Sequence, residues 1–304
     1  MIFAFLTTLL WSASAVTARR LVEALGSLTA NLARLALASA LLAAWAFLAG
    51  RGLQGAGLWW FVASGVVGFG LGDVALYFAL ARLGSRLTIL LTQTLAAPIG
   101  ALVEWLWLGT TLSAAELACG AGVIGGVALA LVPSDNPHVA PGSLRRGLGW
   151  GVLAAVGQGL GAVLSRKAFE LSLAGGVRID GATAAFQRIL GGLAVGLVAW
   201  LLWRSRSGEG GAESATATAA PLRGWRLAAL LLAVALFGPV VGVACYQWAL
   251  ASAPSGVVLP VVALCPVVII PFSARFEGDR PKARSLWGAG LAVASAIALA
   301  AVRR

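Results

Sequence analysis

The chain of 304 residues is 60% hydrophobic and only 11% charged, with a formal net charge of +11. Its apolar residues form stretches of about 20, the length of a helix that spans a bilayer, which excludes a water-soluble domain. The basic residues gather in short clusters between these stretches, such as Arg19-Arg20 and Arg303-Arg304, where lipid headgroups attract cations, so the charge does not indicate nucleic-acid binding.

The apolar stretches predict an all-α, multi-pass integral protein of the cell membrane, with the lipid bilayer as its surroundings. Ten transmembrane helices are expected, and they lie in chain order at 2–18, 29–49, 58–80, 86–107, 113–132, 148–167, 180–203, 225–250, 255–275 and 283–302. A Pro/Gly-rich connector at 133–147 follows the fifth helix, and a polar loop at 205–221 follows the seventh. Tryptophans near many predicted helix ends are typical of the aromatic belts at membrane interfaces.

The two halves, 1–132 and 148–304, resemble each other in sequence. The segment at 31–51 (NLARLALASALLAAWAFLAGR) aligns with the segment at 185–206 (AFQRILGGLAVGLVAWLLWRSR), which matches Arg34 with Arg188. Five helices are an odd number, so the second half enters the membrane with the opposite orientation. Two inverted five-helix repeats are a recurring transporter design, with the substrate held near the midplane between them.

Two further segments carry a family resemblance. GDVALYFALARLGSRLTILL runs on to Pro98 in the first half, and YQWALASAPSGVVLPVVALCP is followed by FEGDRP in the second. Their order and duplication resemble the drug/metabolite transporter superfamily, specifically its EamA-type ten-helix members. The resemblance implies a secondary active transporter of a small metabolite that works by alternating access, with export as one direction.

The resemblance also implies an arrangement of the helices. The last helix of each half, at 113–132 and 283–302, is expected to stand outside the substrate cavity or to contribute to protein contacts, such as those of a homodimer. Both termini are expected in the cytoplasm. The distribution of Lys and Arg between the connectors favours the opposite orientation, because the connectors on the far side of the membrane from the termini carry more of them.

Asp73 lies within an apolar stretch, where a charge is costly and indicates a functional site. Its expected partner is Arg34, since the two residues lie near the same end of neighbouring antiparallel helices, at depths that differ by about 3 Å. Two roles remain open: a static ion pair that locks two helices, or coupling to a proton or another ion. The GLGD sequence also resembles intramembrane aspartyl proteases, but the other aspartates lie in loops or at helix ends, so no second one lies in the middle of a predicted helix.

Arg188 lacks such a partner, because the position that matches Asp73 in the second half is Gly242. Its partner could be a backbone carbonyl, Gln187, Gln247, water or a substrate anion, and its side chain could instead reach the interface. Arginine binds carboxylates and phosphates in a bidentate manner. Arg188 therefore favours an anionic or zwitterionic substrate.

Polar and aromatic side chains inside the helices complete the candidate substrate site, although each could equally serve helix packing. These residues are Trp11, Ser14, Tyr77, Gln93, Gln158, Tyr246 and Gln247. The sequence contains no metal-binding or cofactor motif and no HExxH, GxSxG or Walker A sequence, so an enzyme is not expected. The alternative to a transporter is a polytopic receptor or scaffold that does not transport.

Overall fold

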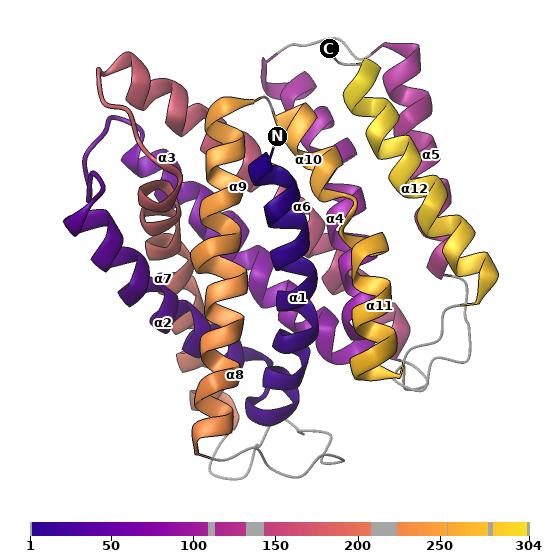
Figure 1. The fold of residues 1–304 in the computed structure, drawn as a ribbon, viewed down its shortest axis with the longest axis horizontal. Coiled ribbons are helices and arrows are strands. Elements are labelled where there is room, and N and C mark those ends of the chain that lie inside the picture. Colours follow the sequence, from indigo (N-terminus) through magenta and orange to yellow (C-terminus); the bar gives the residue numbers. More distant parts are fainter. Residues whose placement is uncertain are drawn as a thin grey trace.

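The computed structural model describes residues 2–108, 113–131, 143–207, 224–253, 255–278 and 282–302, and in these ranges it is built of helices without a β-strand (Figure 1). Seven helical stretches are long and apolar enough to cross a membrane: Ile2–Leu25, Ser27–Leu48, Leu58–Trp107, Leu144–Ala174, Gly181–Ser205, Trp225–Ser252 and Val258–Glu277. The expected class of an all-α membrane protein is confirmed. The number of ten transmembrane helices stays a prediction.

The first half begins with α1 (Ile2–Leu25) and α2 (Ser27–Leu48), which are separated by Gly26 at a φ of 78°. Next come α3 (Leu58–Gly65), the π-helical segment η1 (Val66–Gly72) and α4 (Asp73–Leu108), which follow one another without a gap. The sequence predicted two separate helices here. The continuous stretch of 50 residues would be about 75 Å long if straight, more than twice the hydrocarbon thickness.

Gly84 divides this long stretch. Its backbone has a φ of 75° and a ψ of 173°, which are not helical values, so α4 consists of two helical parts that meet at a bend. A glycine is favoured at this position because side chains with a Cβ rarely adopt a positive φ. The bend lies between the two predicted helices, at 80–86.

The remaining helices follow in a similar pattern. They are α5 (Ala114–Leu131), α6 (Ser143–Ala174), α7 (Gly181–Ser207), α8 (Trp225–Ala235), the π-helical segment η3 (Leu236–Val240), α9 (Val241–Ser252), α10 (Ser255–Val262), α11 (Cys265–Glu277) and α12 (Ala283–Val302). The predicted helix at 255–275 is interrupted at residues 263–264. Positions 133–142 of the predicted connector and 208–221 of the predicted polar loop lie outside the described residues.

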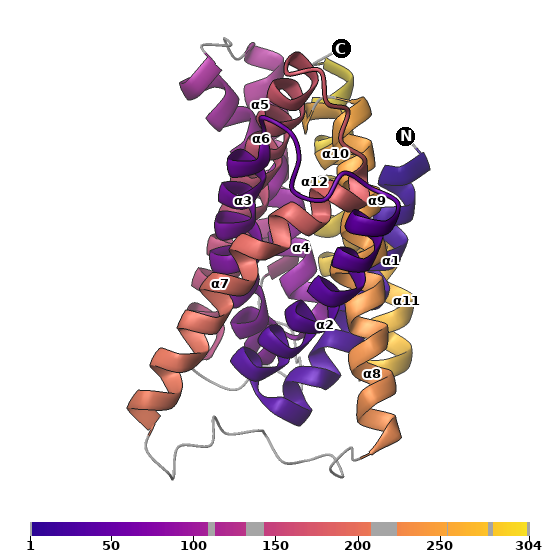
Figure 2. The same cartoon turned by 90° about the vertical axis from the view of Figure 1, so that its left-hand side faces the viewer.

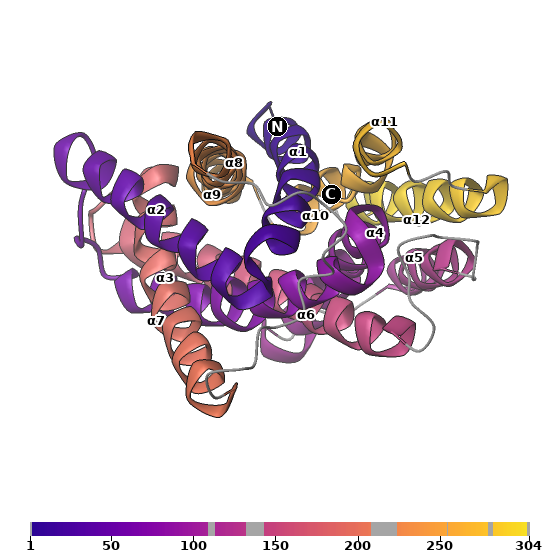
Figure 3. The same ribbon diagram turned by 90° about the horizontal axis from the view of Figure 1, so that it is seen from below.

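Helix packing places α4 along α6 and α2 along α7, so that segments from both halves alternate around the centre of the bundle (Figures 1 and 2). Helices α5 and α12 pack mainly against each other, at the edge of the bundle that lies away from α2 and α7 (Figure 3). This position agrees with the expectation that the last helix of each half stands outside the cavity. Their role in a homodimer stays a prediction.

Candidate functional site

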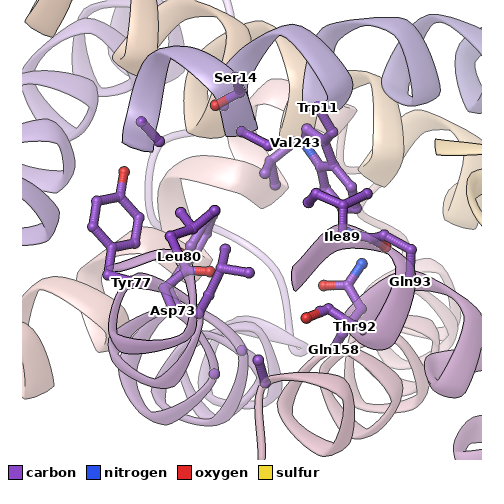
Figure 4. A pocket seen from close by; sticks show the side chains of 18 of the residues that line it. Trp11, Ser14, Asp73, Tyr77, Leu80, Ile89, Thr92, Gln93, Gln158 and Val243 are labelled. Carbon is purple, nitrogen blue, oxygen red and sulfur yellow. The ribbon is translucent and has the colours of Figure 1, made fainter. Parts of the chain in front are cut away.

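A cavity lies at the centre of the bundle, and eight of the ten side chains that the sequence suggested for the site line it. Figure 4 labels six of these eight, all except Arg34 and Arg188. These eight are Trp11, Ser14, Arg34, Asp73, Tyr77, Gln93, Gln158 and Arg188. They come from α1, α2, α4, α6 and α7, and hence from both halves of the chain. The cavity contains about 710 Å³ of space between protein atoms, counted with its open mouth.

Arg34 and Asp73 form the expected ion pair. Arg34 on α2 donates a hydrogen bond from Nη2 to the carboxylate of Asp73, which is the first residue of α4. Arg34 also donates from Nε and Nη2 to Oδ1 of Asn31, at 3.1 Å and 3.0 Å, and its guanidinium carbon lies 4.7 Å from the centre of the Tyr77 ring. The arginine is thus held from three directions, which compensates for the burial of its charge.

The glycine-rich segment η1 positions Asp73 against its neighbours. A π-helix has a wider turn than an α-helix and often occurs at functional sites. Its glycines permit close approach: a Cβ on Gly72 would lie 3.3 Å from Cα of Gly157 on α6, and one on Gly68 would lie 2.9 Å from Nη2 of Arg188. Side chains at these positions would therefore separate η1 from α6 and α7.

Arg188 on α7 is buried, with only 3% of its surface exposed. Its guanidinium lies in a slot between Gly68 and Gly161, and its central carbon is 5.1 Å from the centre of the Phe69 ring. The interpretation that Arg188 reaches the membrane interface is therefore wrong. Gln187 is not its partner either, because Gln187 Oε1 accepts no hydrogen bond within the described residues, and its Nε2 donates to the carbonyl oxygens of Gly52 and Gln54, at 3.0 Å and 2.9 Å.

Arg188 also lies within electrostatic range of Tyr246 and of Asp73, the hydrogen-bonded partner of Arg34. Arg34, Asp73 and Arg188 are the charged residues among those that line the cavity. Two guanidinium groups and one carboxylate leave one positive charge uncompensated within the cavity. The formal charge of the cavity lining is therefore positive.

Five polar atoms in the cavity lining are buried and have no hydrogen-bond partner among the residues that the structure describes. They are the Tyr77 hydroxyl, Thr92 Oγ1, Gln93 Oε1, Gln158 Nε2 and Arg188 Nε. Buried polar atoms are nearly always paired, so a group of unpaired ones requires an explanation. A polar molecule in the cavity could accept from Arg188 and donate to Gln93 at the same time.

Two of the predicted residues do not line the cavity. Tyr246 and Gln247 on α9 are fully buried, and the Trp11 ring, whose centre is 5.0 Å from that of Tyr246, lies at the cavity wall in their place. The sequence also missed Thr92 and Phe69, both of which line the cavity. A threonine or phenylalanine within an apolar helix gives no signal that separates a cavity position from a packing position.

Within the described ranges, no group of three or more His, Cys, Asp and Glu side chains could hold a metal ion. The model of the EamA-like transporter family matches residues 1–132 and 145–301 of the chain. The crystal structure of another protein aligns with a TM-score of 0.62 and a sequence identity of 18%, and covers 98% of this chain and 94% of that one. At this identity the likeness shows a shared fold alone. No curated protein matches the chain.

Proposed function

The chain belongs to the EamA-like transporter family, whose members are membrane transporters of the drug/metabolite type, and from this premise we propose that it is a secondary active carrier. The proposed substrate is a small anionic or zwitterionic metabolite, which the carrier moves across the cell membrane by alternating access, with export as one of the two directions left open. No nucleic acid, cofactor or catalytic reaction forms part of the proposal. Two inverted five-helix repeats, with both termini in the cytoplasm, provide its framework.

The observation that carries this proposal is the set of unpartnered polar atoms around one cavity. Arg188 is buried without a hydrogen-bond partner for Nε in the described part of the chain, and Asp73, within its electrostatic range, is hydrogen-bonded to Arg34 instead. A carboxylate or phosphate of the substrate would pair with the guanidinium of Arg188. The unpartnered oxygen and nitrogen atoms of Gln93 and Gln158 would bind the polar groups on the rest of the molecule.

The shapes of the two halves support the inverted-repeat arrangement. Segment η1 ends directly before Asp73, and segment η3 ends two residues before Gly242, the position that matches Asp73. The non-helical residues correspond as well, since Gly84 lies seven residues after Tyr77, and the extended residue Ala253 lies seven residues after Tyr246. Similar local sequences thus produce similar irregularities in both halves.

For Asp73 we propose that its pair with Arg34 holds α2 against the start of α4. A second role, in which Asp73 exchanges a proton or another coupling ion when the pair opens, makes a separate prediction. Asp73→Asn should then alter the pH dependence of transport in proteoliposomes. An unchanged rate and pH profile in this variant would remove the coupling role and leave the structural one.

Ligand-induced thermal stabilisation of the purified protein tests the substrate class. Anionic and zwitterionic metabolites should raise the unfolding temperature of the wild type by mass action. Arg188→Ala should remove this stabilisation, whereas Arg204→Ala, at an exposed arginine that stacks on Trp200, should retain it. Stabilisation that persists in Arg188→Ala would exclude Arg188 from the site.

Two outcomes of the same screen would contradict the proposal. Stabilisation by cations alone would direct attention to Asp73 and to a cationic substrate. The absence of any stabilising ligand would favour a receptor or scaffold that does not transport. A reporter fused after Arg304 would separately determine which side of the membrane holds the C-terminus.

A further inference from the structure

Tyr246 and Gln247 are buried polar residues that the cavity does not explain. Their side chains are 1% and 0% exposed. The Tyr246 hydroxyl and both polar atoms of the Gln247 amide have no hydrogen-bond partner within the described ranges. Burial of an unsatisfied donor or acceptor is unfavourable, and three such atoms on neighbouring residues require an explanation.

Helix α1 packs along α9 and covers Tyr246. The Trp11 ring packs on the Tyr246 ring, and the Thr7 hydroxyl donates to the carbonyl oxygen of Gly242 at 3.3 Å. In α1 the cavity lining begins at Trp11 and continues toward the C-terminal end of the helix, whereas Ala4 and Thr7 are fully buried. Trp11 therefore lies where the cavity ends, with Tyr246 behind it.

The counterparts of Tyr246 and Trp11 are arranged differently, although the counterpart of Tyr246 is equally buried, at 1% exposed. Tyr77 is the counterpart of Tyr246, and Gln158 is the counterpart of Trp11 when the end of the first helix, at 17–20, is aligned with 164–167. Tyr77 and Gln158 both line the cavity and face it from different sides (Figure 4). The two equivalent pairs thus differ. Trp11 and Tyr246 are in contact, whereas Gln158 and Tyr77 are separated by the cavity.

From this asymmetry we infer that the contact between Trp11 and Tyr246 is a closed gate, and that Tyr246 and Gln247 line the cavity and bind substrate in the opposite-facing state. Because the two halves are similar in sequence, each can adopt the arrangement of the other. Tyr77 and Gln158 then close one end of the cavity while Trp11 and Tyr246 separate at the other. The inference rests on the proposed function, since only a carrier with alternating access has an opposite-facing state.

Cysteine labelling tests this inference without a known substrate. The native cysteines at 119, 245 and 265 are replaced by serine, and single cysteines are introduced as Tyr77→Cys, Tyr246→Cys and Gln247→Cys. A membrane-impermeant maleimide is added to one side of oriented vesicles at a time. We expect Tyr77→Cys to react only from the side where the chain bends at Gly84, and the other two variants to react only from the opposite side.

Two results of this experiment would overturn the inference. One is reaction of Tyr246→Cys and Gln247→Cys from the same side as Tyr77→Cys. The other is no reaction of either variant in the folded protein, with full reaction after unfolding. Both results would leave the substrate class untouched, because that is measured separately by ligand stabilisation of the wild type and Arg188→Ala.

Two substitutions should move the gate in opposite directions. A Cβ on Gly242 would lie 2.7 Å from the Trp11 ring, so Gly242→Ala should displace Trp11 and speed the labelling of Gln247→Cys at least about fivefold. Gly290→Ala, where a Cβ meets no atom within 4 Å, is the control and should not change the rate. An unchanged rate in a folded Gly242→Ala protein would contradict the inference.

The second substitution, Tyr246→Phe, keeps the ring contact with Trp11 and removes the unpartnered hydroxyl. This variant also replaces Gly242→Ala as the test if Gly242→Ala does not fold. The Cβ added at residue 242 would lie 2.2 Å from the carbonyl oxygen of Phe237 as well. Removal of an unsatisfied group should favour the closed gate and slow the labelling of Gln247→Cys about fivefold or more. Labelling that is faster or unchanged in this variant would show that the Tyr246 hydroxyl gains no hydrogen-bond partner when the gate opens, which would contradict the inference.

Discussion

Removal of the Arg34 side chain should reveal how the charge of Asp73 is stabilised. In Arg34→Ala, Asp73 loses its hydrogen-bonded partner and retains only its electrostatic interaction with Arg188. Loss of one member of a buried ion pair costs about 3–5 kcal/mol. The Asp73 side chain is 17% exposed, and Arg188 still compensates for part of its charge, so we expect the lower end, about 3 kcal/mol.

The reverse substitution should be milder. In Asp73→Asn, Arg34 retains its two hydrogen bonds to Asn31 and its position over the Tyr77 ring, so we expect a loss of about 1–2 kcal/mol. The double variant removes both charges together. It should therefore be less destabilised than the sum of the two single variants, by a coupling free energy of about 1–2 kcal/mol.

The assay is the free energy of unfolding of the purified protein in detergent micelles, measured for the wild type, both single variants and the double variant. Losses that add without coupling would refute the ion pair as the source of the effect. An equal loss in Asp73→Asn and Arg34→Ala would show that Asn31 and Tyr77 do not hold Arg34 in place.

Two glycine substitutions give further predictions. In Gly65→Ala, the new Cβ would lie 1.6 Å from the carbonyl oxygen of Arg188, so we expect little folded protein by size-exclusion chromatography, whereas Gly125→Ala, with no atom within 4 Å, should elute like the wild type. In Gly84→Ala, the residue would have to adopt a positive φ with its Cβ 2.5 Å from Nη1 of Arg19, so thermal unfolding should show a loss of more than about 1 kcal/mol. A wild-type unfolding temperature in Gly84→Ala would contradict this account of the bend.

The ion pair between Arg34 and Asp73 could be predicted from the sequence because it needs only two facts. Neighbouring antiparallel helices joined by a short connector lie side by side, and the helical rise then gives the depth of each residue. The same counting failed for Arg188. Its distance from the start of α7 suggested an interfacial side chain, but the slot that buries it is formed by Gly68 and Gly161, which belong to other helices.

Tyr246 shows a second limit of sequence reasoning. The repeat made it equivalent to Tyr77, and on this basis both tyrosines were expected in the substrate site. The two tyrosines are equally buried, at 1% exposed, but Trp11 packs over Tyr246, whereas Tyr77 and Gln158 lie on different sides of the cavity. The sequence of one repeat cannot indicate which of the two arrangements it takes at a given moment.

If the proposed carrier mechanism holds, the charges of the cavity would also make transport depend on voltage. Arg34, Arg188 and Asp73 together carry one net positive charge when the cavity is empty, and a bound monoanion would neutralise it. One elementary charge that crosses the whole membrane field changes its energy by about 2.3 kcal/mol per 100 mV. The return of the empty carrier would therefore respond to the membrane potential, whereas the step that carries a monoanion would proceed almost independently of it.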